Sequence, residues 1–459
     1  MINDTIGAIS SAKGKGGVAI IRISGQEALD IVERIFVLPN GKKLENPEGR
    51  RCYYGKILRD GKEIDDVVLT VFKAPASYTG EDVCEISCHG GLYVTQAVLE
   101  TVLGAGARMA LPGEFTRRAY VNGKLSLSRA EAVGQAIDAT NDAQLRLSVN
   151  ARGSALSERL DKIRALMLDL LSRAYVIVDY PDEELPSLER EQMADSIDAI
   201  LSNLSTLKRT YRTSRAVIEG VKTAIVGRPN AGKSSLYNAI SGEDLAIVTD
   251  IAGTTRDVIE HTVSVGDVTL RLSDTAGIRD TQDAVEKIGV ERARARLDES
   301  ELVLAVFDAS VLENSEDHEI LDTVSQKSAI AIINKSDSER KMSAEFEEKI
   351  RKAVPRVVYM SAKSGDGLDS LASELGQMYA LDEIDISNDA VITNARQASA
   401  LSRALDKVSE ASELLKIGES PDIICFSLEQ GLASLDEIDA RGVSEEIVNT
   451  IFSRFCVGK

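Results

Sequence analysis

Cysteine is scarce in this 459-residue chain, and the five present (Cys52, Cys84, Cys88, Cys425 and Cys456) form no CxxC pair. Such sparse, odd-numbered use of cysteine is typical of a reducing compartment. Basic residues are also few, because 54 Lys and Arg stand against 73 Asp and Glu and leave a net charge of −19. A protein this acidic is a poor candidate for clamping nucleic acid by bulk electrostatics.

Long apolar segments are missing as well. The longest runs are pieces such as 302–307 (LVLAVF), far below the roughly 18–20 residues of a membrane span. The opening residues Met1 to Asp4 carry neither the basic region nor the apolar stretch of a secretion signal. The composition, 43% hydrophobic and 28% charged, is ordinary for a globular protein. We therefore expect a soluble, cytoplasmic protein of about three domains.

Residues 1–120 mix strand-like runs with helical stretches, separated by Gly and Pro, which predicts a compact α/β domain. The strand-like runs are 17–24, 66–72 and 83–88, and the helical stretches lie near 26–36 and 91–103. Cys84 and Cys88 share a face of one run and His89 follows. A metal site is conceivable there, but buried strand cysteines are the favoured interpretation because no fourth ligand is near.

Two helical segments, 121–215 and 380–459, carry one-sided apolar stripes at spacings of three and four. Ser128 and Glu131 predict a capping box at the start of the first. Between these segments, 216–379 alternates apolar runs with helical periodicity, which is typical of a doubly wound, mostly parallel sheet. The runs are 223–226, 268–272, 302–307, 329–333 and 357–360.

The fold class that follows is multidomain α/β plus all-α. The α/β domain 216–379 is expected to be inserted into one helical domain, whose parts 121–215 and 380–459 pack together to bury their stripes. The alternative is two separate helical pieces.

Residues Gly227 to Ser234 read GRPNAGKS and fit the phosphate-loop pattern GxxxxGKS, directly after a strand-like run and before a helical one. Its glycines let backbone N–H groups surround phosphates. Lys233 would reach the β- and γ-phosphates, and the Ser234 hydroxyl would ligate Mg²⁺. The sequence therefore predicts a nucleotide site here.

Further motifs follow in order at expected strand ends. Within GTT, Thr255 can place a second hydroxyl on Mg²⁺; within DTAG, Asp274 can support the ion and the Gly277 amide can sense the γ-phosphate. Within NKSD, Asp337 can accept two hydrogen bonds from the N1 and N2 edge of guanine, which adenine cannot donate. The motif Ser361-Ala362-Lys363 can support the base. The set resembles the translation-factor-like class of P-loop GTPases.

Hydrolysis needs a different explanation, because Ile278 stands where small GTPases carry the glutamine that orients water. A neutralising cation contributes about 10³–10⁵ in rate. Asn230, with carbonyls of 249–254, could hold a monovalent cation; the alternative is a side chain that only stabilises the loop. Any of the acidic residues between 280 and 286 could orient water, although a solvated helix start explains them too.

Several segments together carry a resemblance over the whole chain. They are GRPNAGKSSL, DIAGTTRD, DTAGIR, NKSD, residues 4–6 (DTI), 22–25 (RISG), 78–82 (YTGED), 89–91 (HGG) and the terminal FCVGK. On these, the sequence resembles the MnmE (TrmE) family of tRNA modification GTPases, and the two termini around the G domain make the match specific. One departure is Ser11-Ala12, where the family usually has Thr-Pro, which leaves the conformation of that loop open.

This resemblance implies an N-terminal folate-binding domain (1–120) that mediates homodimerisation, a helical domain (121–215 and 380–459) and an inserted G domain (216–379). It implies joint action with the FAD-dependent flavoprotein MnmG, which forms a heterotetramer with the family's proteins. The product is an aminomethyl or carboxymethylaminomethyl group at carbon 5 of the tRNA wobble uridine. The one-carbon unit would come from 5,10-methylene- or 5-formyl-tetrahydrofolate, and K⁺ would stimulate hydrolysis by promoting G-domain dimerisation.

The family's functional residues carry over onto matching positions. The water-orienting glutamate matches Glu286. The Mg²⁺ ligands match Ser234 and Thr255, and the K⁺ ligands match Asn230, Thr249, Ile251 and Thr254. The folate contacts match Arg22, Glu81, Lys124 and Lys459. The expected GTP contacts are Asn230, Ala231, Gly232, Lys233, Ser234, Ser235, Thr249, Asp250, Ile251, Ala252, Gly253, Thr254, Thr255, Asp274, Thr275, Ala276, Gly277, Asn334, Lys335, Asp337, Ser361, Ala362 and Lys363.

Other interpretations stay open at this point. Cys456, on a tail that could reach the folate pocket, is equally well explained as a structural cysteine. A K⁺-dependent ribosome-assembly GTPase would explain the G domain but not the domain ahead of it, and a scaffold that only binds nucleotide is compatible with Ile278. Residues 380–459 hold 15 acidic against 7 basic residues, so we expect tRNA binding to be weak or shared with a partner.

Overall fold

The structure, a computed structural model, describes residues 4–12, 14–179, 190–242, 261–272, 298–439, 441, 445–453 and 455–458. The chain forms two compact units, Met1–Gly134 with Asp436–Lys459, and Gln135–Leu435. The division into four segments expected from the sequence stays a prediction.

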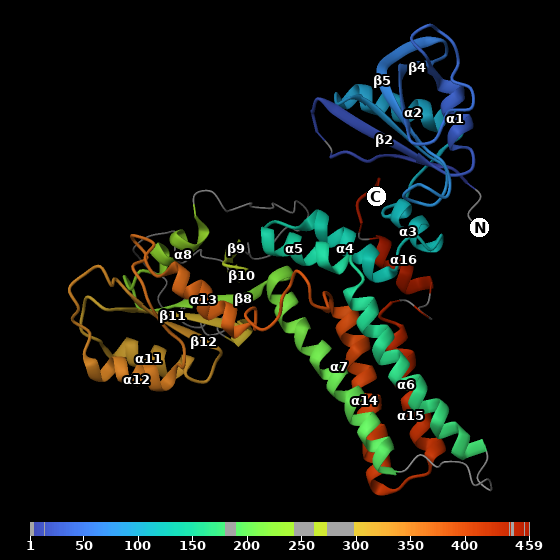
Figure 1. The fold of residues 1–459 in the computed structure, drawn as a ribbon. Coiled ribbons are helices and arrows are strands. Elements are labelled where there is room, and N and C mark those ends of the chain that lie inside the picture. Colours follow the sequence, from blue (N-terminus) through green and yellow to red (C-terminus); the bar gives the residue numbers. More distant parts are fainter. Residues whose placement is uncertain are drawn as a thin grey trace. The chain divides into compact units, whose positions relative to one another are not determined.

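A seven-stranded sheet of order β3-β4-β5-β6-β2-β1-β7 organises the first unit. Neighbouring strands in this sheet run antiparallel, except that β1 and β7 run parallel to each other. Helices α1 and α2 pack on one face of this sheet (Figure 1). The strands are β1 (Ile6–Ile9), β2 (Val18–Ser24), β3 (Phe36–Val37), β4 (Arg51–Arg59), β5 (Lys62–Phe72), β6 (Val83–His89) and β7 (Arg108–Met109). The helices are α1 (Ala28–Ile35), α2 (Leu92–Gly104), α3 (Glu114–Val121), α4 (Leu127–Asp138) and α16 (Glu445–Ser453).

The alternation of side chains along β2 decides which residues face the helices. Ile21 and Ile23 are fully buried and belong to the core beneath α1 and α2. Because successive strand residues point to opposite faces, Arg22 lies on the side away from α1 and α2, where it is only partly exposed. This face carries the polar site described below.

The C-terminal segment returns to the first unit, where α16 packs on α3 and α4. Val448 and Phe452 share a buried cluster with Leu127 and Ala130. The predicted capping box at Ser128 is wrong. The helix begins at Leu127, so Ser128 lies inside it. Ser126 Oγ accepts from the Arg129 N–H at 3.3 Å, while Ser128 Oγ donates to the Ile438 carbonyl at 3.0 Å.

In the second unit, a six-stranded sheet has the order β13-β12-β11-β8-β10-β9. The pairs are parallel except β9 with β10, and helices lie on both faces, so the predicted doubly wound sheet is confirmed. The strands are β8 (Val221–Val226), β9 (His261–Val265), β10 (Val268–Leu272), β11 (Leu302–Asp308), β12 (Ala329–Asn334) and β13 (Val357–Tyr359). The helices around it are α8 (Lys233–Ser241), α11 (Ser315–Val324), α12 (Ala344–Ala353) and α13 (Leu368–Met378).

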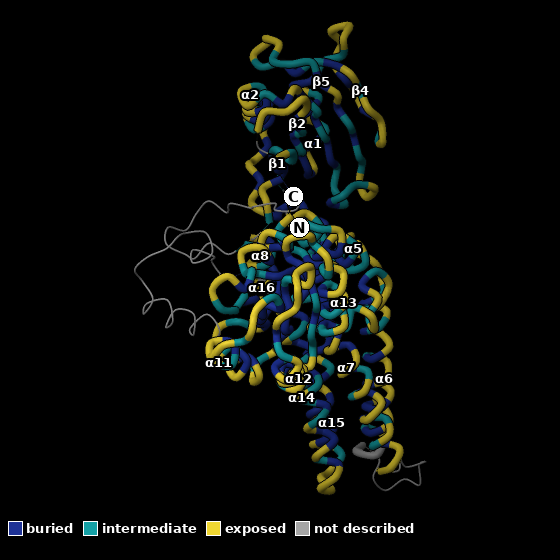
Figure 2. Tube along the Cα trace, turned by 90° about the vertical axis from the view of Figure 1, so that its left-hand side faces the viewer, coloured by how far each residue is buried: buried dark blue, intermediate teal, exposed yellow. Residues whose placement is uncertain are grey.

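Long helices complete this unit: α5 (Asp142–Ala151), α6 (Ala155–Asp179), α7 (Arg190–Ile218), α14 (Ala395–Ile417) and α15 (Pro421–Asp436). Helix α7, before the sheet in sequence, packs against α14, which follows it, and against α6. The apolar stripes are buried between them, as the dark blue positions in Figure 2 show. None of the described helices combines the length and apolar character that a transmembrane span requires.

Candidate functional site

The phosphate loop connects the end of β8 to the start of α8, as the motif predicts. Its helix-capping residue is Gly232, with φ of 100° and no side chain to occupy the helix N–H groups. A Cβ at Gly232 would overlap the Asn334 amide, so the close approach requires glycine. Backbone N–H groups at such a helix start form a ready site for phosphate.

Within the loop, the Lys233 ammonium is held by the backbone. Its Nζ donates to the carbonyls of Gly227 and Arg228 at 2.7 and 2.8 Å, and burial lowers the pKa of Lys233. Asn230 is exposed on the same loop with φ of 62°, and Ser234 and Ser235 are exposed in the first turn of α8.

One side chain joins three of the predicted nucleotide motifs. Asn334, 2% exposed at the end of β12, donates through Nδ2 to the Ala231 carbonyl at 2.9 Å. Its Oδ1 accepts from the Ala362 N–H, also at 2.9 Å. Asn334 therefore fixes the phosphate loop and the SAK loop relative to the NKSD loop.

The NKSD loop carries an exposed carboxylate, that of Asp337. Asp337 is solvent-exposed, and a hydrogen bond with Ser361, together with Lys363 and Lys335, holds the pKa of Asp337 below its usual value. An ionised carboxylate there can accept paired N–H donors. Lys335, with φ of 63°, bonds through Nζ to Asp308 Oδ2 at 2.6 Å.

Sequence reasoning missed Asp308 and the ion pair between Arg228 and Asp317, whose nearest charged atoms are 3.4 Å apart. Asp308 ends a fully buried strand and is itself 5% exposed. A carboxylate closing an apolar strand was the available signal, because carboxyl ends of parallel strands gather at the ligand-binding edge.

The remaining predicted nucleotide residues lie outside the described part of the chain. These are Thr249, Asp250, Ile251, Ala252, Gly253, Thr254 and Thr255, with Asp274, Thr275, Ala276, Gly277 and Glu286. The Mg²⁺ ligands, the K⁺ ligands and the water-orienting glutamate all remain predictions.

A second polar site occupies the sheet face of the first unit that is opposite α1 and α2. Arg22 on β2 forms an ion pair with Glu85, with Nε to Oε1 at 2.8 Å, and donates through Nη1 to the Gly458 carbonyl at 3.3 Å. Its guanidinium carbon lies 5.6 Å from the ring centroids of both Tyr78 and Phe115. The C-terminal tail is thus fastened beside Arg22.

Glu81 and Lys124 lie at the same site. Ser24, two residues from Arg22 on β2, donates from Oγ to Glu81 Oε2 at 2.7 Å. A Cβ at Gly80 would come within 3.3 Å of Lys124 Cγ, and Lys124 Nζ donates to the Pro75 carbonyl at 3.0 Å. The structure thus brings three of the four predicted folate contacts together.

The fourth predicted contact, Lys459, lies outside the described residues, but the tail before it is placed. Ser10 Oγ donates to the Gly458 carbonyl at 2.9 Å, and the Gly113 N–H donates to the Cys456 carbonyl at 3.3 Å. The Cys456 side chain is exposed. The tail thiol is therefore accessible beside the polar site.

The conceivable metal site on β6 is not supported. Cys84 and Cys88 are buried, and burial raises the pKa of both thiols, to about 12 for Cys84. His89 points elsewhere and contacts Asp65, with Nδ1 to Oδ1 at 2.7 Å. Among the residues the structure describes, no cluster of three metal-ligating side chains occurs.

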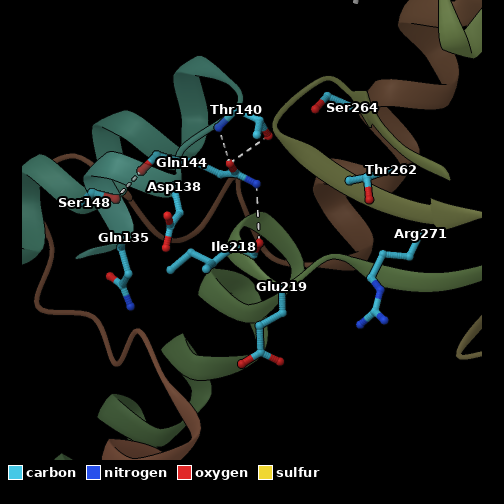
Figure 3. A pocket seen from close by; sticks show the side chains of 10 residues that line it. All are labelled: Gln135, Asp138, Thr140, Gln144, Ser148, Ile218, Glu219, Thr262, Ser264 and Arg271. Carbon is cyan, nitrogen blue, oxygen red and sulfur yellow. Dashed lines mark hydrogen bonds between the residues drawn. The ribbon is translucent and has the colours of Figure 1, made fainter. Parts of the chain in front are cut away.

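A polar cavity of about 280 Å³ lies in the second unit between α5, the end of α7 and β9 (Figure 3). Gln144 is at its centre, accepting from the Thr140 N–H at 2.8 Å and donating to the Ile218 carbonyl at 3.4 Å. Asn141 Nδ2 donates to Ser264 Oγ at 2.8 Å and joins α5 to the β9–β10 hairpin. No predicted site residue belongs to its described lining.

Comparisons with known proteins agree along the chain. A family model described as the GTP-binding protein TrmE N-terminus matches residues 5–124, and one for the MnmE helical domain matches residues 127–456. Curated proteins named tRNA modification GTPase MnmE, from Carboxydothermus hydrogenoformans and Clostridioides difficile, are 38% and 39% identical over 100% of both chains. The solved G domain of the T. maritima FeoB iron transporter is 26% identical with a TM-score of 0.25, over 35% of this chain and 98% of that one.

Together the two family models match almost the entire chain. The two full-length relatives are also similar enough in sequence, at 38% and 39% identity, to show membership of the same family. The resemblance inferred from the motifs is therefore confirmed: the chain belongs to the MnmE family of tRNA modification GTPases.

Proposed function

We propose that this protein hydrolyses GTP as part of a tRNA modification enzyme. The observation that carries the proposal is the pair of hydrogen bonds made by Asn334, which hold the phosphate loop and the guanine-recognition loop in one site. Asp337 would accept the N1 and N2 hydrogens of guanine, and Lys233 would leave its loop carbonyls to meet the phosphates. Full-length similarity to proteins named tRNA modification GTPase supports tRNA as the object of the reaction.

Metal ions would complete the nucleotide site. The exposed Ser234 hydroxyl, at the first turn of α8, is suited to Mg²⁺, with Thr255 as its second ligand. The exposed Asn230 amide suits a hard monovalent cation, K⁺, together with Thr249, Ile251 and Thr254. These ions supply positive charge against the phosphates, and Glu286 would orient the attacking water.

Reduced folate is the proposed ligand of the polar site in the first unit. Its glutamate tail needs cations, which Arg22, Lys124 and Lys459 would supply, and Glu81 would pair with the pterin edge. The contacts of Arg22 and Glu81 with neighbouring side chains support this assignment, because they leave both side chains oriented. The 5,10-methylene or 5-formyl form would bring the one-carbon unit.

Partners follow from the same proposal. The protein would act as a homodimer and join the flavoprotein MnmG, which would supply the redox chemistry of adding an aminomethyl or carboxymethylaminomethyl group to the wobble uridine. Binding of tRNA would be weak or shared, in line with the net charge of −19.

The test is mass spectrometry of modified nucleosides in tRNA from cells lacking this gene. We expect loss of 5-carboxymethylaminomethyl and aminomethyl wobble uridine, restored by the intact gene but not by a Glu286→Ala copy. Unchanged nucleosides with accumulating ribosomal subunits would instead indicate an assembly GTPase. GTP turnover in K⁺ against Na⁺ tests the cation, and no turnover in either would indicate a scaffold.

A further inference from the structure

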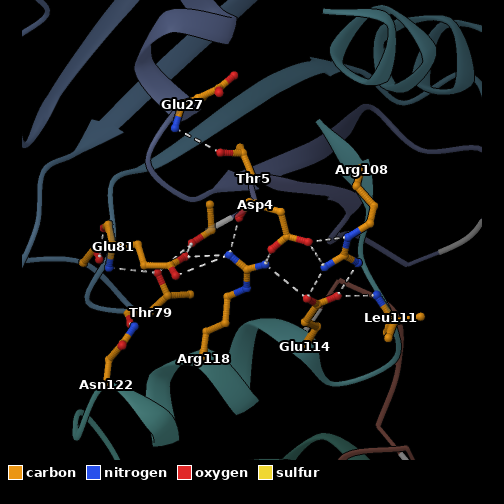
Figure 4. A network of polar contacts seen from close by, with 12 residues as sticks. Asp4, Thr5, Glu27, Thr79, Glu81, Arg108, Leu111, Glu114, Arg118 and Asn122 are labelled. Carbon is orange, nitrogen blue, oxygen red and sulfur yellow. Dashed lines mark hydrogen bonds and ion pairs between the residues drawn. The ribbon is translucent and has the colours of Figure 1, made fainter. Parts of the chain in front are cut away.

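Arg118, on α3 in the first unit, is a buried cation surrounded by three carboxylates. Its side chain is 1% exposed. The guanidinium contacts Asp4 Oδ1 at 2.7 Å and Glu114 Oε1 at 3.2 Å through Nη2. Through Nη1 it reaches Glu81 Oε2 at 3.1 Å and Oε1 at 3.3 Å (Figure 4). The planar guanidinium of Arg118 therefore links its own helix α3 to the N-terminal segment at Asp4 and to the loop that carries Glu81.

Glu81 is restrained on every side that faces the protein. Ser24 donates to its Oε2, and Thr79 Oγ1 accepts from the Glu81 N–H at 3.2 Å. Ser24 and Thr79, both fully buried, are themselves bonded at 2.7 Å between their hydroxyl oxygens. The Glu81 side chain nevertheless stays 18% exposed, so an oriented edge of its carboxylate is left for a ligand.

Stability alone does not explain this arrangement. Burying a guanidinium costs several kcal/mol, and well-packed apolar residues are often at least as stabilising as a buried ion pair. Arg118 Nε is buried with no hydrogen-bond partner among the described residues, a further cost. What a guanidinium provides and an apolar side chain cannot is a fixed, planar orientation of carboxylates.

We infer that Arg118 is a positioning residue of the polar site, holding the Glu81 carboxylate in the plane in which it accepts paired N–H donors from the pterin ring of a reduced folate. The inference rests on the folate binding proposed above. Arg118 itself does not touch the ligand; it acts through Glu81. Without it, the Glu81 carboxylate would lose its guanidinium partner while Asp4 and Glu114 kept Arg108, and repulsion from these two carboxylates would turn Glu81 away.

Arg108 offers a matched control within the same network. It bonds to Asp4 Oδ2 at 2.7 Å through Nε and to Glu114 Oε1 at 2.7 Å through Nη2. No described contact joins it to Glu81. A substitution of Arg108 thus disturbs two of the three carboxylates of Arg118 and spares the one that the inference concerns.

The experiment titrates the purified full-length protein with 5-formyl-tetrahydrofolate by calorimetry. We expect Arg118→Met to weaken binding about 10- to 100-fold, the range of a lost charged hydrogen bond, and Arg108→Met to change it less than about threefold. Because Arg118 acts through Glu81, the double variant Glu81→Gln/Arg118→Met should bind no more weakly than Glu81→Gln. A merely structural role would make the two losses multiply.

Folding is followed through GTP binding and thermal unfolding of each variant. If Arg118→Met does not fold, Arg118→Lys decides, because lysine keeps the charge but cannot bridge three carboxylates, and should lose about tenfold. If the wild type binds the folate and the Kd of a folded Arg118→Met or Arg118→Lys variant is within threefold of the wild-type Kd, the inference about Arg118 is wrong. The proposed folate site would not be affected by that result. A wild-type protein that does not bind the folate would overturn both.

Discussion

Removing the Asn334 side chain tests the central feature of the nucleotide site. In Asn334→Ala, the Ala231 carbonyl and the Ala362 N–H both lose their hydrogen-bond partner. Residues 231 and 362 are buried, so water does not easily replace the amide. Each orphaned group costs about 1–3 kcal/mol, or about 2–6 kcal/mol for the pair before any relaxation.

We expect the substitution to weaken nucleotide binding, because the two loops that Asn334 joins would contact the phosphates and the base. Even the lower limit of about 2 kcal/mol corresponds to about 30-fold in Kd. Asn334→Asp separates the two bonds. It retains an oxygen for the Ala362 N–H but faces the Ala231 carbonyl with a second acceptor, so it should lose at least as much affinity.

The assay is titration with a fluorescent GDP analogue, with thermal unfolding recorded for the same samples. Asn394→Ala is the matched control, since Asn394 caps α14 by accepting from the Gln397 N–H at 3.0 Å. Its loss should cost about 1 kcal/mol of stability and leave the Kd unchanged. A Kd for Asn334→Ala within threefold of the wild type would refute the bridging role.

Three further outcomes are expected. Gly232→Ala should abolish GDP binding in the same titration, because its Cβ overlaps the Asn334 amide at a φ of 100°; retained binding would contradict the close approach. Asp337→Asn should weaken GTP binding about 100-fold and favour xanthosine triphosphate in competition assays, since an amide donor suits the xanthine carbonyl; unchanged guanine preference would exclude Asp337 as the selector. The Asp65 carboxylate accepts a hydrogen bond from the His89 ring and raises the pKa of His89, so Asp65→Asn should lower that pKa in an NMR titration. The stability contributed by this pair is complete below the unfolded histidine pKa of about 6.5 and is lost as the pH rises through the folded value; equal pH profiles for wild type and Asp65→Asn would argue against the pairing.

Sequence reasoning worked where the signal is local. The apolar run 329–333 lies within β12, and the stripe of α7 is buried as its spacing predicts. Motif positions such as Gly232 and Asp337 fall at the ends of strands or the start of a helix. It failed at Ser128, because either serine can bond a free helix N–H and only packing selects Ser126.

The amino-acid sequence alone therefore determined the helices and strands, the order of the nucleotide motifs and the family. Periodicity, turn residues and motif spacing are signals that involve only a few neighbouring residues. Tertiary structure decided what meets across long separations. Asn334 bridges residues 231 and 362, Arg118 gathers three carboxylates, and the Gly458 carbonyl meets Arg22. Such contacts depend on how strands and helices pack and on which buried polar groups need partners, and no sequence period specifies them.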